Sequence, residues 1–113
     1  MMRSLFRKDL TRRSGLMQRL FLKQDRIFWV NSQIDENLLD LVKMIIRCNK
    51  EDKDKPVEER VPIKVFIDSP GGDVIVLWTT IKAIELSKTP VHTINYCTAY
   101  SAAGDLLVAG HKR

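Results

Sequence analysis

The segment IKVFIDSPGGDVIVLWTTIKAIEL, residues 63–86, decides the fold of this chain. Its first part, Ile63–Ile67, is a short apolar run that predicts a buried strand, and Gly71 and Gly72 predict a tight turn after it. Apolar residues then return at helical spacing, namely Val74, Leu77, Trp78, Ile81 and Ile84 or Glu85. A strand, a glycine turn and a helix in this order form the βα unit of an α/β domain.

Further strands are predicted on both sides of this unit. Arg26–Val30 is a compact apolar run bounded by polar residues, and the run VHTINY at 91–96 has the same character. A short helix over Ala102–Ala109, ended by Gly110, is expected to follow the last strand. The alternation predicts an α/β fold in which parallel strands are joined by right-handed crossover helices.

The segment between the first two strands predicts a helix and then a charged loop. Asp35 is expected to cap the helix, because its carboxylate can accept hydrogen bonds from free N–H groups of the first turn. The residues expected on its buried side recur at spacings of three and four: Leu38, Leu41, Val42, Ile45 and Cys48. The charged run NKEDKDKPVEER at 49–60 predicts a surface loop, and Trp78 on the next helix is expected in the core.

The net charge of +5 comes from the N-terminal part of the chain. Residues 1–25 hold seven Lys/Arg and two Asp, which leaves twelve basic and twelve acidic residues in the remainder. We therefore expect a basic arm over 1–15 ahead of one α/β domain over 16–113, with an amphipathic helix at Leu16–Lys23. The arm is interpreted as a solvated leader, with an organelle transit peptide and contact with RNA or a membrane as alternatives.

Other features argue against several kinds of site. No apolar run approaches the roughly 18 residues of a membrane span, so no membrane partner is expected, and nucleic acid is not the expected partner either. Cys48 and Cys97 lack the paired spacing of a zinc site or a disulfide framework. We expect two buried thiols in a reducing compartment, and no metal.

The candidate chemistry lies in two turns that follow strands. Turns after neighbouring parallel strands share one edge of the sheet, so SPGGD at 69–73 and TAYSA at 98–102 are expected to face each other. Glycines let N–H groups point into a cleft, and Ser101 at a helix start gains further N–H donors. Each motif alone is more simply a turn or an N-cap. Together they predict a nucleophile beside donors that stabilise an oxyanion.

Three runs resemble the proteolytic subunit of the Clp protease: DRIFWVNSQID at 25–35, IKVFIDSPGGDV at 63–74 and TPVHTINYCTAYSAAGDLLVAGHKR at 89–113. The chain is more distantly similar to signal-peptide peptidase A and the crotonase superfamily. The resemblance implies the ClpP/crotonase-like ββα superhelix, with its C-terminal part absent from these 113 residues. It also implies that Ser101 is the nucleophile and that the N–H groups of Gly72 and Ala102 form the oxyanion hole. The substrate loop would consist of Ser69, Pro70 and Gly71.

The general base is the missing part of this prediction, because the family carries its catalytic His and Asp beyond the matched region. His92 is expected roughly 20 Å or more from Ser101 along an extended strand, and His111 about 15 Å away along a helix. General-base catalysis needs hydrogen-bond contact, so both histidines are interpreted as structural or surface residues. Asp105 lies one helical turn from Ser101, but a carboxylate of ordinary pKa is a poor base for a serine.

The resemblance implies a serine endopeptidase subunit of a Clp-like ATP-dependent protease, which hydrolyses unfolded polypeptides through an acyl-enzyme on Ser101. It implies no cofactor, stacked heptameric rings that are homo-oligomeric or mixed, and an AAA+ unfoldase such as a Clp ATPase as partner. The expected location is the cytoplasm, or an organelle such as a chloroplast or mitochondrion. One alternative is a noncatalytic assembly or regulatory subunit, or a truncated paralogue without the catalytic His and Asp. The other is an acyl-CoA enzyme of the crotonase type.

Overall fold

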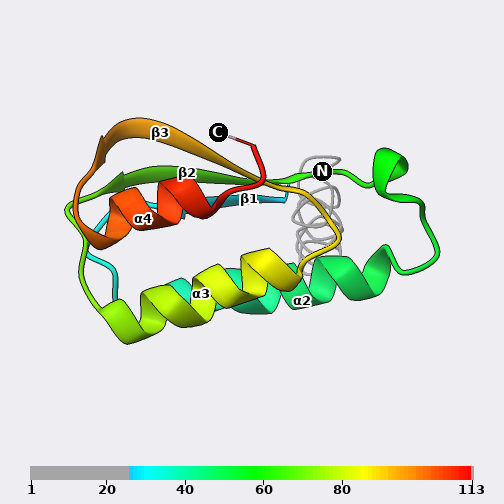
Figure 1. Cartoon of the computed structure of the whole chain (residues 1–113), viewed down its shortest axis with the longest axis horizontal. Helices are drawn as coiled ribbons and strands as arrows, with labels where there is room; N and C mark the ends of the chain where they lie inside the picture. The colour runs from blue at the N-terminus through cyan, green and yellow to red at the C-terminus, as the bar shows by residue number, and fades with distance from the viewer. Residues whose placement is uncertain (1–25, 113) are drawn as a thin grey trace, which may run out of the picture.

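The computed structural model describes residues 26–112 (Figure 1), so the predicted basic arm and the helix at Leu16–Lys23 lie outside the described residues. The described strands are β1 (Ile27–Val30), β2 (Ile63–Ser69) and β3 (Val91–Ala99). The helices are α2 (Leu39–Glu51), α3 (Val74–Leu86) and α4 (Ala102–Ala109), with 3₁₀ turns η1 (Glu36–Leu38) and η2 (Val57–Glu59). The predicted strands and helices of this region are confirmed, although β2 and β3 run two and three residues longer than expected.

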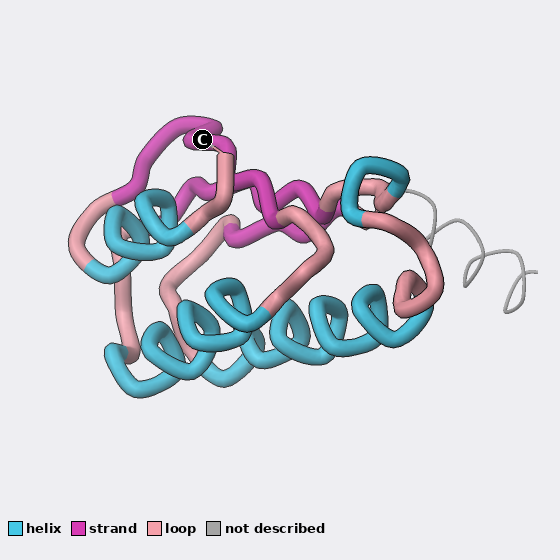
Figure 2. Tube along the Cα trace, turned by 45° about the vertical axis from the view of Figure 1, so that its right-hand side comes forward, coloured by secondary structure: helices cyan, strands magenta, loops and turns pink. Residues whose placement is uncertain are grey.

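The three strands form one parallel sheet in the order β1-β2-β3. The register pairs Ile27 with Lys64 and Ile63 with Val91. Figures 1 and 2 show α2, α3 and α4 on the same side of the sheet, which gives a two-layer α/β arrangement. The prediction of parallel strands connected through helices is therefore confirmed, and the carboxyl ends of β2 and β3 lie at one edge.

The start of α2 follows the predicted capping. The Asp35 carboxylate accepts a hydrogen bond from the Asn37 N–H at 2.9 Å and caps η1, which runs directly into α2. The predicted apolar stripe is buried, with Val42 only half-buried and Met44 added to it: Leu38, Leu41, Met44, Ile45 and Cys48. This stripe holds α2 against the sheet.

The two faces of the sheet differ in composition. Ile63, Val65 and Ile67 alternate along β2 and are fully buried beneath the helices, as the two-residue period of a strand requires. On the other face, Trp29 stacks on Phe66 with ring centroids 4.5 Å apart, and Tyr96 meets Trp29 edge-on at 5.3 Å. Within residues 26–112 no helix covers these rings, so they shield this face of the sheet by packing on one another.

The charged run 49–60 differs from its prediction as a surface loop, because two of its charges are buried. Asp52 is 1% exposed and receives two bonds from the Arg26 guanidinium, at 2.6 and 2.9 Å. The Thr89 hydroxyl donates a third bond to Asp52 at 2.9 Å. Arg60 is also buried. The bonds of Asp52 tie the start of β1, the end of α2 and the approach to β3 together.

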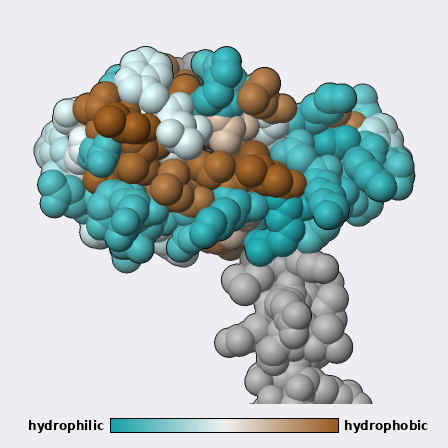
Figure 3. All heavy atoms as spheres, turned by 90° about the horizontal axis from the view of Figure 1, so that it is seen from below, coloured by the Kyte–Doolittle hydropathy of each residue, from teal (hydrophilic) through white to brown (hydrophobic). Residues whose placement is uncertain are grey.

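The prediction that Trp78 lies in the core is wrong, because its side chain is 62% exposed. The core face of α3 consists of Leu77, Thr80, Ile81 and Ile84. Thr80 can occupy a buried position because its hydroxyl donates to the Val76 carbonyl at 2.9 Å. Trp78 is therefore an exposed aromatic residue of the helical layer. Figure 3 shows in brown other hydrophobic residues that are exposed when the molecule is seen from below. No helix within residues 26–112 has both the length and the apolar character needed to cross a membrane.

Candidate active site

The SPGGD and TAYSA turns leave the sheet side by side. The end of β2 pairs with the end of β3 through Ser69 and Ala99, after a register irregularity between Ile67 and Ser69. The Tyr100 N–H donates to the Ser69 carbonyl at 3.1 Å. This pairing brings the two turns to the same edge of the sheet, as the parallel topology predicts (Figure 1).

The SPGG turn is held by its own serine and by an upstream segment. The buried Ser69 hydroxyl accepts a hydrogen bond from the Gly71 N–H at 3.1 Å, while Pro70 is exposed. The Ile34 N–H donates to the Gly71 carbonyl at 2.7 Å, and the Ile34 carbonyl accepts from the Asp73 N–H at 2.8 Å. Together, the bonds from Ser69 and Ile34 hold the SPGG turn in one conformation.

Both glycines of this turn are required by their surroundings. Gly71 and Gly72 have φ values of +108° and +153°. A Cβ on Gly72 would overlap the Ile34 carbonyl oxygen and lie 2.7 Å from the Ile34 nitrogen. The contact with Ile34 was missed from the sequence, and its one signal is an apolar residue alone within the polar run NSQIDEN.

The face of Gly71 that lacks a side chain packs against the serine turn. A Cβ on Gly71 would lie 3.0 Å from the Ser101 Cβ and 3.2 Å from the Ala102 nitrogen. Such distances leave no room for a side chain, so the two turns are in direct contact. The two predicted halves of the site therefore meet.

Ser101 occupies the N-cap position of α4 but does not cap it with its hydroxyl. Its backbone has φ +54° and ψ −123°, a conformation that is costly for a residue with a side chain. The residue is exposed, and its hydroxyl makes no hydrogen bond with any residue of 26–112. Ser101 is therefore the N-cap residue by position, but its hydroxyl does not satisfy an N–H group of the first turn.

Two backbone donors, one in the SPGG turn and one in the serine turn, have no acceptor within residues 26–112. The N–H of Ala103 donates to the Tyr100 carbonyl, and the N–H of Gly104 to the Ser101 carbonyl, at 3.0 and 2.9 Å. By contrast, the N–H groups of Gly72 and Ala102 have no acceptor in this part of the chain. Ala102 begins α4, where the helix dipole also favours negative charge. Backbone N–H groups without a partner are the type of donor that stabilises an oxyanion.

Neither histidine lies near this edge. The imidazole Nδ1 of His111 accepts a hydrogen bond from the Val91 backbone N–H at 3.0 Å. The backbone N–H of His111 donates to the Val91 carbonyl at 2.8 Å. His92 follows Val91 and bridges to Lys112. Both histidines are thus at the start of β3, whereas Ser101 follows its end.

The carboxylates near the site are not arranged as bases for Ser101. Asp105 is exposed, and no hydrogen bond joins its carboxylate to the Ser101 hydroxyl. Asp68, the last outward residue of β2, instead accepts bonds from the Thr98 N–H and hydroxyl, at 3.2 and 2.6 Å. Asp68 was not predicted as part of this edge.

The two cysteines differ in exposure, which corrects the prediction that both are buried. Cys48 is buried in the α2 stripe, and burial raises the pKa of its thiol. Cys97 is exposed because β3 curves away from the core toward its end (Figure 1). Among residues 26–112, no three His, Cys, Asp or Glu side chains lie together as metal ligands.

The comparison with protein families gives one finding that covers most of the chain. The family model described as Clp protease matches residues 10–113, which include both turns and every strand of the sheet. The match agrees with the three-stranded parallel sheet and with the resemblance carried by the SPGG turn and the serine turn. The chain belongs to the Clp protease family.

Proposed function

We propose that this chain is a serine-type endopeptidase subunit of a Clp-like ATP-dependent protease, with Ser101 as its nucleophile. One observation carries the proposal: Gly71 packs directly against Ser101 and Ala102. The N–H of the following residue, Gly72, has no acceptor within residues 26–112. The Ser101 hydroxyl is exposed and is not used for capping. A nucleophile and two amide donors at one sheet edge fit acyl transfer better than a structural turn.

In the proposed reaction, the Ser101 oxygen attacks the carbonyl carbon of the scissile peptide bond while a base takes the hydroxyl proton. The carbonyl oxygen becomes an oxyanion that accepts hydrogen bonds from the N–H groups of Gly72 and Ala102. Removal of one such donor typically costs about 3 kcal/mol of transition-state stabilisation. The C–N bond then breaks, the amine leaves with the proton, and water releases the acyl group from Ser101.

The substrate class follows from the open backbone at this edge. An extended polypeptide lies beside the loop of Ser69, Pro70 and Gly71 as an added strand, held mainly by main-chain hydrogen bonds. Such bonds read little of the side-chain sequence, which suits unfolded polypeptides. The proposed protease therefore depends on an AAA+ unfoldase of the Clp type to deliver them.

Both histidines of the 113 residues lie at the start of β3, so the proposed base is a histidine that this sequence does not contain. Family membership supports an oligomeric assembly in general and a Clp ATPase as its partner. We propose stacked heptameric rings, either of this chain alone or mixed with a related subunit. The proposed location is the cytoplasm or an organelle such as a chloroplast or mitochondrion.

The proposal is tested by reacting the purified protein with a fluorophosphonate probe and locating the label by peptide mass spectrometry. Labelling at Ser101, its loss in Ser101→Ala, and cleavage of an unfolded protein in the presence of the unfoldase are the expected results. Labelling only in an assembly with a related subunit supports the mixed ring. Absence of labelling in every well-folded oligomer contradicts a catalytic role.

A noncatalytic assembly or regulatory subunit is the second candidate, because both histidines lie at the start of β3, away from Ser101. It predicts that Ser101→Ala leaves the activity of a mixed assembly unchanged. The crotonase-type alternative shares the paired amide donors but needs no nucleophile. It predicts binding of an acyl-CoA thioester that persists in Ser101→Ala, which neither of the other functions predicts.

A further inference from the structure

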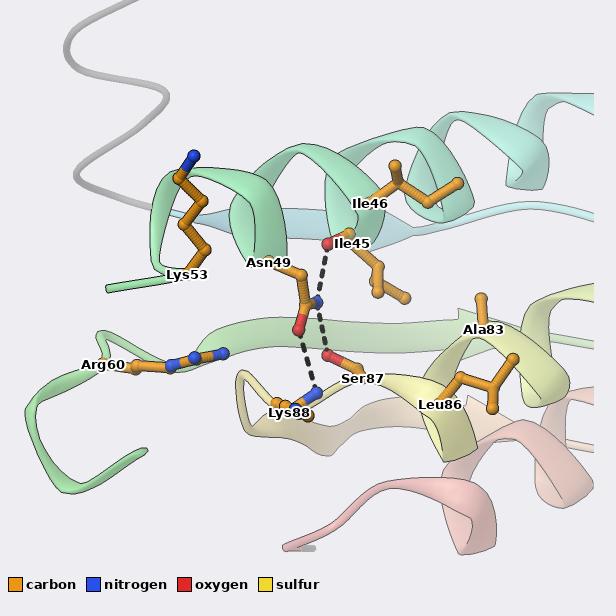
Figure 4. Close-up of a pocket in the computed structure, with 9 residues that line it drawn as sticks. All are labelled: Ile45, Ile46, Asn49, Lys53, Arg60, Ala83, Leu86, Ser87 and Lys88. Carbon is orange, nitrogen blue, oxygen red and sulfur yellow. Dashed lines mark hydrogen bonds between the residues drawn. The ribbon is translucent and has the colours of Figure 1, made fainter. Parts of the chain in front are cut away.

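A pocket of about 550 Å³ opens between the C-terminal ends of α2 and α3 (Figure 4), and Ser101 is not among the residues that line it. Its apolar walls come from Ile46 on α2 and from Ala83 and Leu86 on α3. Ile46 and Leu86 are 63% and 73% exposed, so these walls lack cover within the described part of the chain. The volume lies within the range of pockets that bind small organic molecules.

The polar part of the pocket carries only positive charge. Lys53, Arg60 and Lys88 line it, and no Asp or Glu does. Arg60 is only 9% exposed, and in Figure 4 its side chain extends from its loop toward the pocket. A guanidinium buried to this extent normally has a carboxylate partner.

Within residues 26–112, Arg60 has no such partner. Its Nε donates to the Lys55 carbonyl at 3.1 Å and its Nη1 to the Thr89 hydroxyl at 3.4 Å, and no carboxylate pairs with it within residues 26–112. Asp52 also contacts the Thr89 hydroxyl, but both of its oxygens are bonded to Arg26.

The second terminal nitrogen of Arg60, Nη2, donates to no residue of the described part. Since no fully buried side-chain nitrogen or oxygen there lacks a partner, Nη2 is not fully buried, and Arg60 is one of the residues that line the pocket. A carboxylate that entered the pocket would accept bonds from Nη2 and from the free hydrogen of Nη1, in the paired geometry that guanidinium favours. Lys53 and Lys88 would add attraction without fixed geometry.

We propose that this pocket binds an organic carboxylate with a short apolar chain, its head at Arg60 and its chain between Ile46 and Leu86. The charge of the pocket argues against the N-terminal segment of this chain as its occupant, because residues 1–25 hold seven basic and two acidic residues. A fatty acid and the free C-terminus of a short apolar peptide both supply the required chemistry. The site does not involve Ser101.

The probes are decanoate and N-acetyl-Leu-Leu, titrated into the full chain by calorimetry below the concentration at which decanoate forms micelles. Decanol and the amide of N-acetyl-Leu-Leu are the neutral counterparts. At least one carboxylate is expected to bind at least tenfold more tightly than its neutral counterpart. Preference for decanoate identifies a fatty acid as the ligand, and preference for N-acetyl-Leu-Leu identifies the C-terminus of a peptide. Raising the salt concentration is expected to weaken that binding.

Leu86→Glu is the main variant, because it places a carboxylate on the wall at an exposed position that folding does not require. At least tenfold weaker binding is expected. Ile75→Glu is the matched control, on the same helix and 79% exposed but outside the pocket, and should leave affinity unchanged. Arg60→Gln, with its fold verified by circular dichroism, should also remove the preference for the charged form.

The proposal is overturned if neither carboxylate binds to the folded wild type, or if each neutral counterpart binds as tightly as its acid. Equal weakening by Leu86→Glu and Ile75→Glu also overturns it. Ser101→Ala is expected to bind the carboxylate normally. Failure of the peptidase proposal would therefore leave this result unaffected, and the reverse also holds.

Discussion

At the start of the strands, the buried Asp52 carboxylate accepts hydrogen bonds from both Arg26 and Thr89. At the carboxyl ends of the strands, the N–H groups of Gly72 and Ala102 have no acceptor within residues 26–112. Unpaired polar groups and strained backbone reduce stability, whereas satisfied buried networks hold a fold in one arrangement. The buried network therefore stabilises the fold at the start of the strands, whereas the two turns at the other end keep backbone donors without an acceptor in residues 26–112.

The largest effect is expected from Asp52→Ala. The substitution leaves the buried guanidinium of Arg26 without its bidentate partner, and breaking such a pair on one side costs about 3–5 kcal/mol. Urea denaturation of the variant should show this loss in the free energy of unfolding. Asp40→Ala is the control, because Asp40 makes only an exposed pair with Lys43 at 3.8 Å, and a change below about 1 kcal/mol is expected.

The ion pair of Asp52 should also make the protein less stable in acid. The hydrogen bonds from Arg26 lower the pKa of Asp52 in the folded protein. Its stabilisation is therefore present above the unfolded pKa of about 3.9 and lost as the pH falls through the lower folded value. Asp52→Asn should lack this part of the pH dependence. An unchanged acid profile in Asp52→Asn would show that Asp52 is not held as a charged partner.

The next effect in size is expected from Gly72→Ala at the opposite end. The new Cβ would overlap the Ile34 carbonyl, and a φ of +153° strains any residue with a side chain. We expect a loss of more than about 2 kcal/mol in the free energy of unfolding, measured with denaturant.

Gly104→Ala is the matched control for the glycine substitution. Gly104 lies within α4, where a Cβ would be 3.1 Å from the Ala99 carbonyl oxygen and a gain in helix propensity of about 1 kcal/mol offsets the tight contact. A change of less than about 1 kcal/mol is expected there. Equal losses in both variants would mean that Ile34 does not fix the SPGG turn.

The sequence was sufficient for the architecture because local patterns decide it. The apolar alternation of Ile63–Ile67 and the helical spacing after Gly72 define a βα unit, and repetition of that unit defines a parallel sheet. The convergence of the two turns also follows, because parallel topology alone puts them at one edge.

Contacts between distant segments were not predictable in this way. The burial of Asp52 depends on Arg26 and Thr89, 26 and 37 residues away, and no local pattern reports such a pairing. Ile34 acts on Gly72 across 38 positions. The exposure of Trp78 depends on which side of α3 meets its neighbours, and a helix with apolar residues on several sides does not reveal that from its sequence.

Ser101→Gly should separate stability from reactivity at the carboxyl end. Glycine tolerates φ +54° without the side-chain strain, so we expect a gain of about 1 kcal/mol in the free energy of unfolding. Ser101→Ala keeps the strain and removes a hydroxyl without partners in residues 26–112, so its stability should stay within about 0.5 kcal/mol of wild type. Thermal and urea denaturation compare the pair. A glycine variant less stable than the alanine variant would contradict the strained conformation.

The smallest effect is expected from His92, at the start of β3. Burial and the positive charges of Lys112, Lys64 and His111 lower its pKa, so the unfolded chain binds the proton more readily than the folded one. Stability should therefore fall as the pH is lowered through the unfolded value of about 6.5, and the loss should level off below the folded value. Denaturation midpoints between pH 8 and pH 5 should show a flatter profile in His92→Gln than in wild type. The four charged or ionisable groups lie together where β3 pairs with residues 111–112. A profile unchanged by His92→Gln would assign the pH response to another group.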